Sequence, residues 1–349
     1  MKRTDSLALI FLAIILFMLA GCGAERQAKT VAGPEPTTSN THQLFAKEGK
    51  IYLDSPFLYV FRSGTIFRRN IRDDNSSWMK TSINTSISGI AAKSQEITVI
   101  GRMGIWHSTF GISGLKLTNV TSPPFPRPLA ICASPTAPQL ILALVGSQLL
   151  KSSNYGATWT KIQQGKRFSL GFPAGIRWNP SAPGQAWIYS TNIFGTGLLW
   201  VVEESGSRTL FSARLDSLFL GSNLYDFNIL DLAFENDNPE TVYLLTNSSE
   251  NQLFKSADGG NSWINPRTAP SGNGRFTAIA GDFRQPQSLF LLDDQANLYH
   301  SADGLNSIQF VEKLDSVGVT RDLLPDLPGN QLLIAADNGV FSTSLSNIP

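Results

Sequence analysis

From about residue 43 the chain consists of short alternating runs of apolar and polar residues, separated by Gly, Asn, Asp and Pro. This alternation predicts β-strands, and no stretch sustains the apolar period of an amphipathic helix. The clearest strands are predicted at residues 139–145, 187–190, 241–245, 288–292, 332–336 and 339–342. Many short strands of this kind predict an all-β sandwich, barrel or propeller.

One ten-residue segment repeats along the chain. Residues 150–159 read Leu-Lys-Ser-Ser-Asn-Tyr-Gly-Ala-Thr-Trp, and residues 254–263 read Phe-Lys-Ser-Ala-Asp-Gly-Gly-Asn-Ser-Trp. A third copy at 299–308 keeps the Ser and the Asp but ends in Ile, and a partial copy keeps Asp73 and Trp78. Self-similarity within an all-β chain favours a propeller over a sandwich or a barrel.

These segments resemble the Asp-box, or bacterial neuraminidase repeat, with the pattern Ser-x-Asp-x-Gly-x-Thr-Trp. The motif occurs in propellers of sialidases, sortilin-like receptors and photosystem II assembly factors. Its Asp or Asn can accept hydrogen bonds from amides of its own turn, its Gly permits a positive φ, and its Trp covers apolar surface beneath the turn. We therefore assign a structural role, closing a hairpin between outer strands, to Asp73, Trp78, Ser152, Asn154, Gly156, Trp159, Ser256, Asp258, Gly260, Trp263, Ser301 and Asp303.

A second signature, an apolar strand and a polar turn ending in proline, precedes the hairpin segments. It ends at Pro138, Pro183, Pro239 and Pro286, with spacings of 45, 56 and 47 residues. One four-stranded propeller blade has about this length. The chain then divides into seven units, at residues 43–84, 85–122, 123–165, 166–222, 223–268, 269–315 and 316–349.

The sequence therefore predicts one propeller domain over residues 43–349, with seven four-stranded blades. Six or eight blades stay open, because the first two units and the fourth are poorly preserved. The last unit lacks a fourth strand, and residues 42–47 are predicted to supply it. This pairing would close the ring and remove exposed strand edges.

The N-terminus has the pattern of a secretory signal peptide. Lys2 and Arg3 precede an apolar run at 7–19, which is too short to span a bilayer comfortably. The following Leu-Ala-Gly-Cys, ending at Cys22, resembles the lipobox of bacterial lipoproteins. The resemblance implies cleavage after residues 1–21 and attachment of diacylglycerol to the Cys22 sulfur. The alternative is an uncleaved membrane anchor, which leaves the rest of the chain on the same side.

Residues 22–42 are rich in Ala, Thr, Pro and Gln and are predicted to form a flexible tether. The propeller would then lie outside the cytoplasm, on the periplasmic or surface side of a cell or outer membrane. Loss of residues 1–21 removes Lys2, Arg3 and Asp5, so the remaining chain is formally neutral.

The net charge and the cysteine content limit the classes of partner that the chain can have. The 349-residue chain has a formal net charge of +1, which argues against a nucleic-acid partner. The basic run Arg62, Arg68, Arg69 and Arg72 is followed by two aspartates and is predicted to be a solvated blade face. With Cys22 lipidated, Cys132 has no partner and is expected to be a small buried thiol.

Catalytic constellations are weak. Two of the three histidines, His107 and His300, occupy a repeat position that we expect to be solvated, and the third is His42. There is no cysteine pair with zinc spacing, no phosphate-binding glycine motif and no Gly-x-Ser-x-Gly. We therefore expect no metal and no cofactor.

The resemblance to sialidases makes glycoside hydrolysis a candidate activity. That chemistry uses an arginine cluster for the substrate carboxylate, a Tyr with a neighbouring Glu as nucleophile, and an Asp as acid and base. The Arg-Ile-Pro of that family is absent, since Arg127 precedes Pro and Arg177 precedes Trp. Three arginines and a Tyr–Glu pair meeting at one mouth of the channel would favour a hydrolase.

Arg177 and Trp178 are the candidate binding residues. Arg177 breaks its repeat, because its counterparts in the predicted innermost strands are the small Cys132, Ala233 and Ala280. An arginine there either forms an internal ion pair or channel-water contact, or binds an anion. Trp178, with Trp187 and Trp200, forms either core or an aromatic contact patch.

We expect a lipid-anchored, extracytoplasmic β-propeller that acts as a non-catalytic scaffold or assembly factor. Its partners would be the membrane, through the lipid, and a protein or glycan held by loops of the rigid ring. The alternative is a degenerate sialidase-like glycoside hydrolase.

Overall fold

The computed structural model describes residues 41–47, 50–117, 128–145, 148–162, 172–191, 197–203, 209–214, 229–247, 252–266, 274–314 and 317–348. The predicted signal peptide, Cys22 and the predicted tether before residue 41 lie outside the described residues. In the described part, no helix has the length and apolar character needed to cross a membrane.

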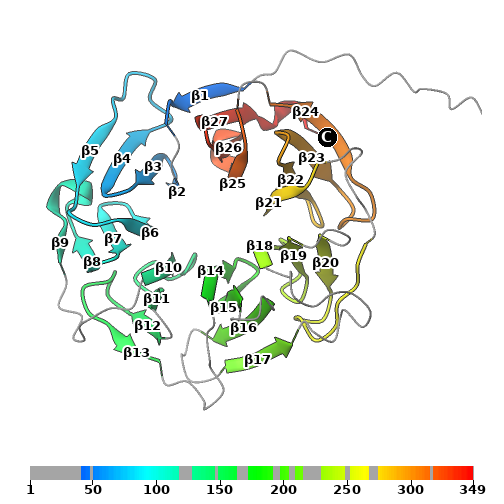
Figure 1. Ribbon diagram of the computed structural model, residues 1–349, viewed down its shortest axis with the longest axis horizontal. Helices are drawn as coiled ribbons and strands as arrows, with labels where there is room; N and C mark the ends of the chain where they lie inside the picture. Colours follow the sequence, from blue (N-terminus) through cyan, green and yellow to red (C-terminus); the bar gives the residue numbers. More distant parts are fainter. Residues whose placement is uncertain are drawn as a thin grey trace, which may run out of the picture. The chain divides into compact units, whose positions relative to one another are not determined.

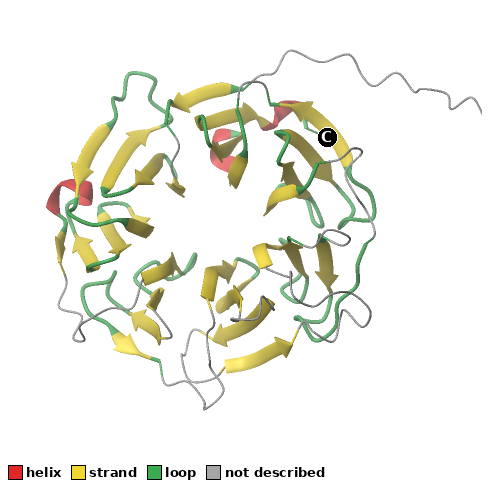
Figure 2. Cartoon of the chain, in the orientation of Figure 1, coloured by secondary structure: helices red, strands yellow, loops and turns green. Residues whose placement is uncertain are grey.

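Seven antiparallel sheets follow one another along the chain and form a ring, which confirms the predicted seven-bladed β-propeller (Figure 1). Strands dominate, with short 3-10 turns at η1 (Gly111–Gly114), η3 (Leu327–Gly329) and η4 (Leu345–Asn347) (Figure 2). Blade 1 contains β2 (Lys50–Asp54), β3 (Phe57–Arg62), β4 (Thr65–Asn70) and β5 (Met79–Ser82). Blade 2 contains β6 (Ile87–Lys93), β7 (Glu96–Gly101), β8 (Gly104–Ser108) and β9 (Lys116–Leu117).

The next four blades continue in the same order. Blade 3 contains β10 (Pro128–Ala133), β11 (Ile141–Val145), β12 (Gln148–Ser152) and β13 (Thr160–Lys161). Blade 4 contains β14 (Phe172–Asn179), β15 (Ala182–Thr191), β16 (Gly197–Glu203) and β17 (Thr209–Arg214). Blade 5 contains β18 (Ile229–Phe234), β19 (Val242–Thr246) and β20 (Leu253–Ser256), with a bridge from Lys255 to Ile264 at the place of its fourth strand. Blade 6 contains β21 (Phe276–Gly281), β22 (Leu289–Asp293), β23 (Asn297–Ser301) and β24 (Gln309–Lys313).

Blade 7 combines the two ends of the propeller. Its strands β25 (Thr320–Asp326), β26 (Gln331–Ala336) and β27 (Gly339–Ser344) are joined by β1 (His42–Phe45). His42 pairs with Ser342 in this antiparallel sheet. The segment at 42–47 therefore supplies the missing strand, as predicted, and β2 of blade 1 contacts β25 to complete the ring.

Hydrophobic clusters lie between all neighbouring blades. The second strands β11, β19 and β22 are buried along their whole length. Both faces of such a strand are covered by adjacent blades, which is why these strands read as continuous apolar runs rather than as alternating patterns. Blade-to-blade packing thus supplies the core and fixes the inner strands around the axis.

The repeated Ser and Asp or Asn side chains close the turn after the third strand. In blade 3, Ser152 Oγ accepts a hydrogen bond from the Gly156 amide at 2.8 Å, and Asn154 Oδ1 accepts one from the Thr158 amide at 2.9 Å. Gly156 has a φ of 89°, and Trp159 Nε1 donates to its carbonyl at 2.9 Å. The side chains therefore satisfy backbone groups that the turn leaves unpaired.

Blades 5 and 6 repeat the hydrogen bond from the turn amide to the Asp or Asn side chain. Asp258 Oδ1 accepts from the Ser262 amide at 2.8 Å, beside Gly260 with a φ of 87°. In blade 6, Asp303 Oδ1 accepts from the Ser307 amide at 2.8 Å, and Leu305 takes the positive φ, at 72°. Leu305 is fully buried, so its packing offsets the strain of that backbone conformation.

The partial copy in blade 1 has a different contact. Asp73 Oδ1 accepts a hydrogen bond from the Asn75 amide at 3.0 Å. The Trp78 ring lies 5.1 Å from the ring of Phe45, centroid to centroid, and therefore packs on the strand that closes the ring.

Candidate functional site

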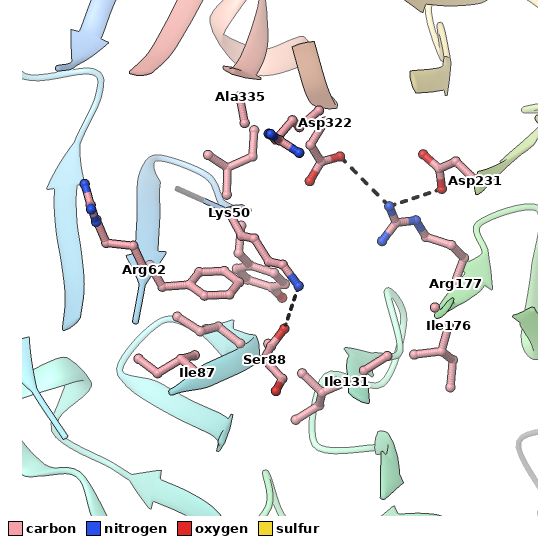
Figure 3. A pocket seen from close by; sticks show the side chains of 18 of the residues that line it. Lys50, Arg62, Ile87, Ser88, Ile131, Ile176, Arg177, Asp231, Asp322 and Ala335 are labelled. Atoms are coloured by element: carbon pink, nitrogen blue, oxygen red, sulfur yellow. Dashed lines mark hydrogen bonds and ion pairs between the residues drawn. The ribbon is translucent and has the colours of Figure 1, made fainter. Parts of the chain in front are cut away.

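The innermost strands line a cavity of about 680 Å³ on the propeller axis (Figure 3). The residues that line it include Lys50 of β2, Ile87 of β6, Ile131 of β10, Arg177 of β14, Asp231 of β18, Thr277 of β21 and Asp322 of β25. All seven blades thus contribute to one site. Cavities of this size on rigid scaffolds are typical binding sites.

Arg177 projects into this cavity and lies between two carboxylates (Figure 3). Its Nη2 is 3.3 Å from Asp231 Oδ1 and 4.0 Å from Asp322 Oδ1. The Arg177 side chain is 42% exposed. Asp231 is the main cause of a raised pKa for Arg177, so the guanidinium stays charged. We call Arg177, Asp231 and Asp322 the acidic wall.

Both carboxylates also accept backbone hydrogen bonds. Asp231 Oδ1 accepts from the Leu232 amide at 2.8 Å and from the Tyr189 hydroxyl at 3.4 Å, and Asp322 Oδ1 accepts from the Leu323 amide at 2.9 Å. Burial raises the pKa of Asp231 and raises that of Asp322 to about 6, although Arg177 opposes both changes. Burial likewise raises the pKa of Tyr189.

A second group of charges lies in blade 1. Lys50 Nζ donates to the Ser88 carbonyl at 3.4 Å, and Arg62 has no hydrogen bond or ion pair with any residue that the structure describes. Lys50 pairs with Phe61 across β2 and β3, which places Arg62 one residue beyond it. We call Lys50 and Arg62 the basic wall. In Figure 3, Arg62 lies on the opposite side of the view from Arg177 and Asp231.

Three arginines, Arg62, Arg177 and Arg321, therefore line one cavity, and Tyr189 donates to a carboxylate there. They do not form the grip that a sialidase needs, because they are directed to different targets. Arg177 contacts the two aspartates, Arg321 is paired with Asp337, and Arg62 lies across the cavity. The partner of Tyr189 is an aspartate rather than a glutamate.

Arg177 and Trp178 are adjacent but have different surroundings. Trp178 is 8% exposed and packs in the hydrophobic cluster between blades 3 and 4. Trp187 is fully buried between blades 4 and 5, and the side chain of Trp200 lies outside the described part of the chain. The indoles of Trp178 and Trp187 therefore belong to the core rather than to a contact patch. Arg177 and Trp178 differ because successive side chains of a strand face opposite sides.

The expectation that His300 is solvated is wrong. His300 is 2% exposed, and its ring lies 5.3 Å from that of Phe290, centroid to centroid, between blades 6 and 7. The third strand of a blade is covered by the neighbouring blade, so this repeat position is internal. His107 is also largely covered, with its side chain 12% exposed and Nε2 3.5 Å from Glu96 Oε2.

His300 lies in a buried polar cluster. Its Nε2 is 2.6 Å from Ser288 Oγ and 3.4 Å from Asp282 Oδ2. A catalytic triad would use both ring nitrogens, one for each partner, so this cluster does not have that geometry. Burial raises the pKa of Asp282, but hydrogen bonds from Arg284 and His300 outweigh it and hold the pKa below its usual value.

Neither a reactive thiol nor a metal site is found among the described residues. Cys132 is a free, partly buried thiol, and burial raises its pKa. Within the described ranges, no group of three or more His, Cys, Asp or Glu side chains is placed to hold a metal ion.

The sequence drew attention to Arg177 but missed its partners. Asp231 lies two residues before the repeat position in β18, within an apolar run, and Asp322 occupies the inner strand of the last blade. The available signal was a charged residue on an innermost strand, once the blades are aligned. Lys50 carries the same signal at the start of β2.

Comparisons with known proteins define the fold. No known protein family matches the chain, and no curated protein matches it. The structure of YCF48 bound to D1 peptide is similar, with a TM-score of 0.65, 14% identity, and coverage of 88% of this chain and 95% of that one. The GH74 xyloglucanase from Xanthomonas campestris has a TM-score of 0.64 and 14% identity, with coverage of 89% of this chain and 54% of that one. Virginiamycin B lyase from Staphylococcus aureus has a TM-score of 0.63 and 12% identity, with coverage of 88% of this chain and 99% of that one. At these identities the likeness shows a shared β-propeller fold, in binding proteins and enzymes alike.

Proposed function

We propose that the chain is a non-catalytic β-propeller that binds a segment of another protein at the axial cavity, as a scaffold or assembly factor. The carrying observation is the division of charge in the cavity. Arg177 lies between Asp231 and Asp322, where it interferes with their use as an acid and base pair. Lys50 acts on Asp322 only at longer range, and neither Lys50 nor Arg62 has a described carboxylate within ion-pair distance. Unpaired cations on a rigid ring suit binding.

The structural neighbours support binding as one use of this architecture. YCF48 has been solved with a bound D1 peptide, and that propeller is similar to 88% of this chain. A polypeptide segment is therefore the type of ligand that we propose for this chain.

Photocrosslinking in membranes tests this proposal. A photoreactive amino acid replaces Leu230, which lines the cavity and is 41% exposed, or Ile264, at the outer edge of the same blade and 63% exposed. We expect the Leu230 variant to capture a defined protein partner and the Ile264 variant to capture none. Capture at Ile264 alone, or at neither site, would contradict the proposal.

We also propose that lipid at Cys22 holds the propeller outside the cytoplasm. The support is the apolar run followed by Leu-Ala-Gly-Cys at the start of the chain. Cys22→Ser should abolish labelling by radioactive palmitate and leave the chain unprocessed or released from membranes, with Cys132→Ser as the matched control. Normal lipid labelling of Cys22→Ser would overturn the assignment.

Glycoside hydrolysis is the second candidate function. One observation favours it: the cavity combines Tyr189, hydrogen-bonded to Asp231, with Asp322, whose pKa of about 6 suits a general acid. A panel of sialosides and polysaccharides tests this candidate. Turnover that is lost in Asp322→Asn and kept in Asp237→Asn, an exposed control, would replace the scaffold proposal.

A further inference from the structure

We infer that the cavity recognises an amphoteric polypeptide segment, whose acidic group lies at the basic wall and whose basic group lies at the acidic wall. This inference rests on the proposed function and specifies its ligand. It follows from which atoms of the two walls already have partners and which do not.

On the acidic wall, one oxygen of each carboxylate has no hydrogen-bond partner among the described residues. Oδ1 of Asp231 and Oδ1 of Asp322 take all the contacts with backbone amides, Tyr189 and Arg177. Each Oδ2 accepts no hydrogen bond from the described residues. The two Oδ2 atoms are therefore available acceptors for an ammonium or guanidinium group of a ligand.

The basic wall has the complementary deficit. Lys50 has only one long hydrogen bond, to a neutral carbonyl, and Arg62 has no partner among the described residues. Two cations that line a cavity attract an anion, and a ligand carboxylate can accept hydrogen bonds from either side chain.

The space between the walls argues for a polypeptide. Ile87 and Ile131 provide aliphatic surface there. A purely anionic ligand would leave the free Oδ2 atoms of the acidic wall without a donor, and a neutral polysaccharide has no charge for either wall. A peptide with an acidic and a basic residue separated by small or apolar residues matches all three features.

Selection from a library of random heptapeptides tests this inference. The full chain, held in detergent, is compared with Lys50→Gln and Asp322→Asn, and with the exposed controls Lys80→Gln and Asp237→Asn. We expect the unmodified chain and both controls to enrich peptides that carry an acidic and a basic residue. Lys50→Gln should lose the preference for the acidic residue, and Asp322→Asn the preference for the basic one.

The best heptapeptide is then resynthesised with its acidic residue replaced by Gln. This change should weaken binding to the unmodified chain by about fivefold and leave binding to Lys50→Gln nearly unchanged. Enriched peptides that lack a charge preference, or that keep it in both cavity variants, would overturn the inference while the proposed binding function stands. Failure to enrich any peptide, together with no capture at Leu230, would overturn both.

Discussion

Two arginines join different blades of this propeller, and they differ in how fully their donors are used. Arg72 of blade 1 donates to Asp326 Oδ1 of blade 7 at 2.8 Å, to the Pro328 carbonyl at 2.9 Å and to Ser55 Oγ at 3.0 Å. Arg177 in the cavity has one nitrogen near two carboxylates, at 3.3 and 4.0 Å. The first guanidinium is well satisfied and the second is not.

This difference separates a structural ion pair from the proposed binding group. Asp326 is fully buried and also accepts from Gln331 Nε2 at 3.0 Å, so the Arg72 pair satisfies groups that water does not reach. Asp322 is 26% exposed in the cavity and keeps a free oxygen. The Arg72 pair therefore holds the closing blades together, whereas the Arg177 cluster keeps a carboxylate oxygen without a described partner, as the proposed binding role requires.

The largest effect on stability is expected when the ion pair between Arg72 and Asp326 is broken. Arg72→Met leaves the buried Asp326 carboxylate without its cation, which should lower the free energy of unfolding by about 1–3 kcal/mol. Urea unfolding followed by tryptophan fluorescence measures this loss. Arg62→Met, at an exposed arginine without a described partner, is the matched control and should change stability by less than about 0.5 kcal/mol. Equal losses in the two variants would remove the distinction.

Arg177→Met should have a smaller effect on folding. Its side chain is 42% exposed and its contacts are long, so the expected loss is about 0–1 kcal/mol in the same unfolding measurement. Binding of the selected heptapeptide should change by more than the stability does, because the carboxylates of Asp231 and Asp322 lose the cation that lies between them. A loss of stability as large as that of Arg72→Met would show that the cavity pair is structural.

The fold could be predicted because it depends on repeated local chemistry. The hairpin segments ending at Trp159 and Trp263 recur at blade spacing, and the closing strand follows from a last unit that is one strand short. Strand and turn chemistry are local, so the sequence displays them directly.

The site could be predicted only in part because its contacts are not local. Arg177 stood out against small counterparts, but the distance between blades 4 and 7 decides that Asp322 reaches it. Arg72 looked like one member of a solvated basic run, and only ring closure brings it to Asp326, 254 residues away. The expectation that His300 is solvated was wrong for a related reason, since the neighbouring blade determines its burial.

The pH dependence of two aspartates sharpens the contrast between free and satisfied carboxylates. Burial raises the pKa of Asp322 to about 6, whereas hydrogen bonds from Ser262 and Ser256 lower that of Asp258 to about 2. The ionised Asp322 opposes folding above pH 6, and this penalty disappears as the pH falls toward 4. Carboxyl carbon NMR should give a midpoint near 6 for Asp322 and near 2 for Asp258. Arg177→Met should move the Asp322 midpoint upward, and a downward movement would contradict the assigned role of the cation.

Asp258→Asn should have the smallest effect, because the turn requires an acceptor rather than a charge. Asn154 already occupies the equivalent position in blade 3, where its Oδ1 accepts from the Thr158 amide at 2.9 Å. We expect only a small loss of stability in urea unfolding at pH 7, because a neutral amide oxygen accepts these hydrogen bonds more weakly than an ionised carboxylate. We also expect a weaker loss of stability between pH 4 and 2, because the lowered pKa of Asp258 stabilises the fold only while the group is ionised. Asp258→Ala, which removes the acceptor, should destabilise the chain at both pH values. If Asn and Ala behaved alike at pH 7, the charge rather than the hydrogen bond would hold the turn, and Asn154 would need another explanation.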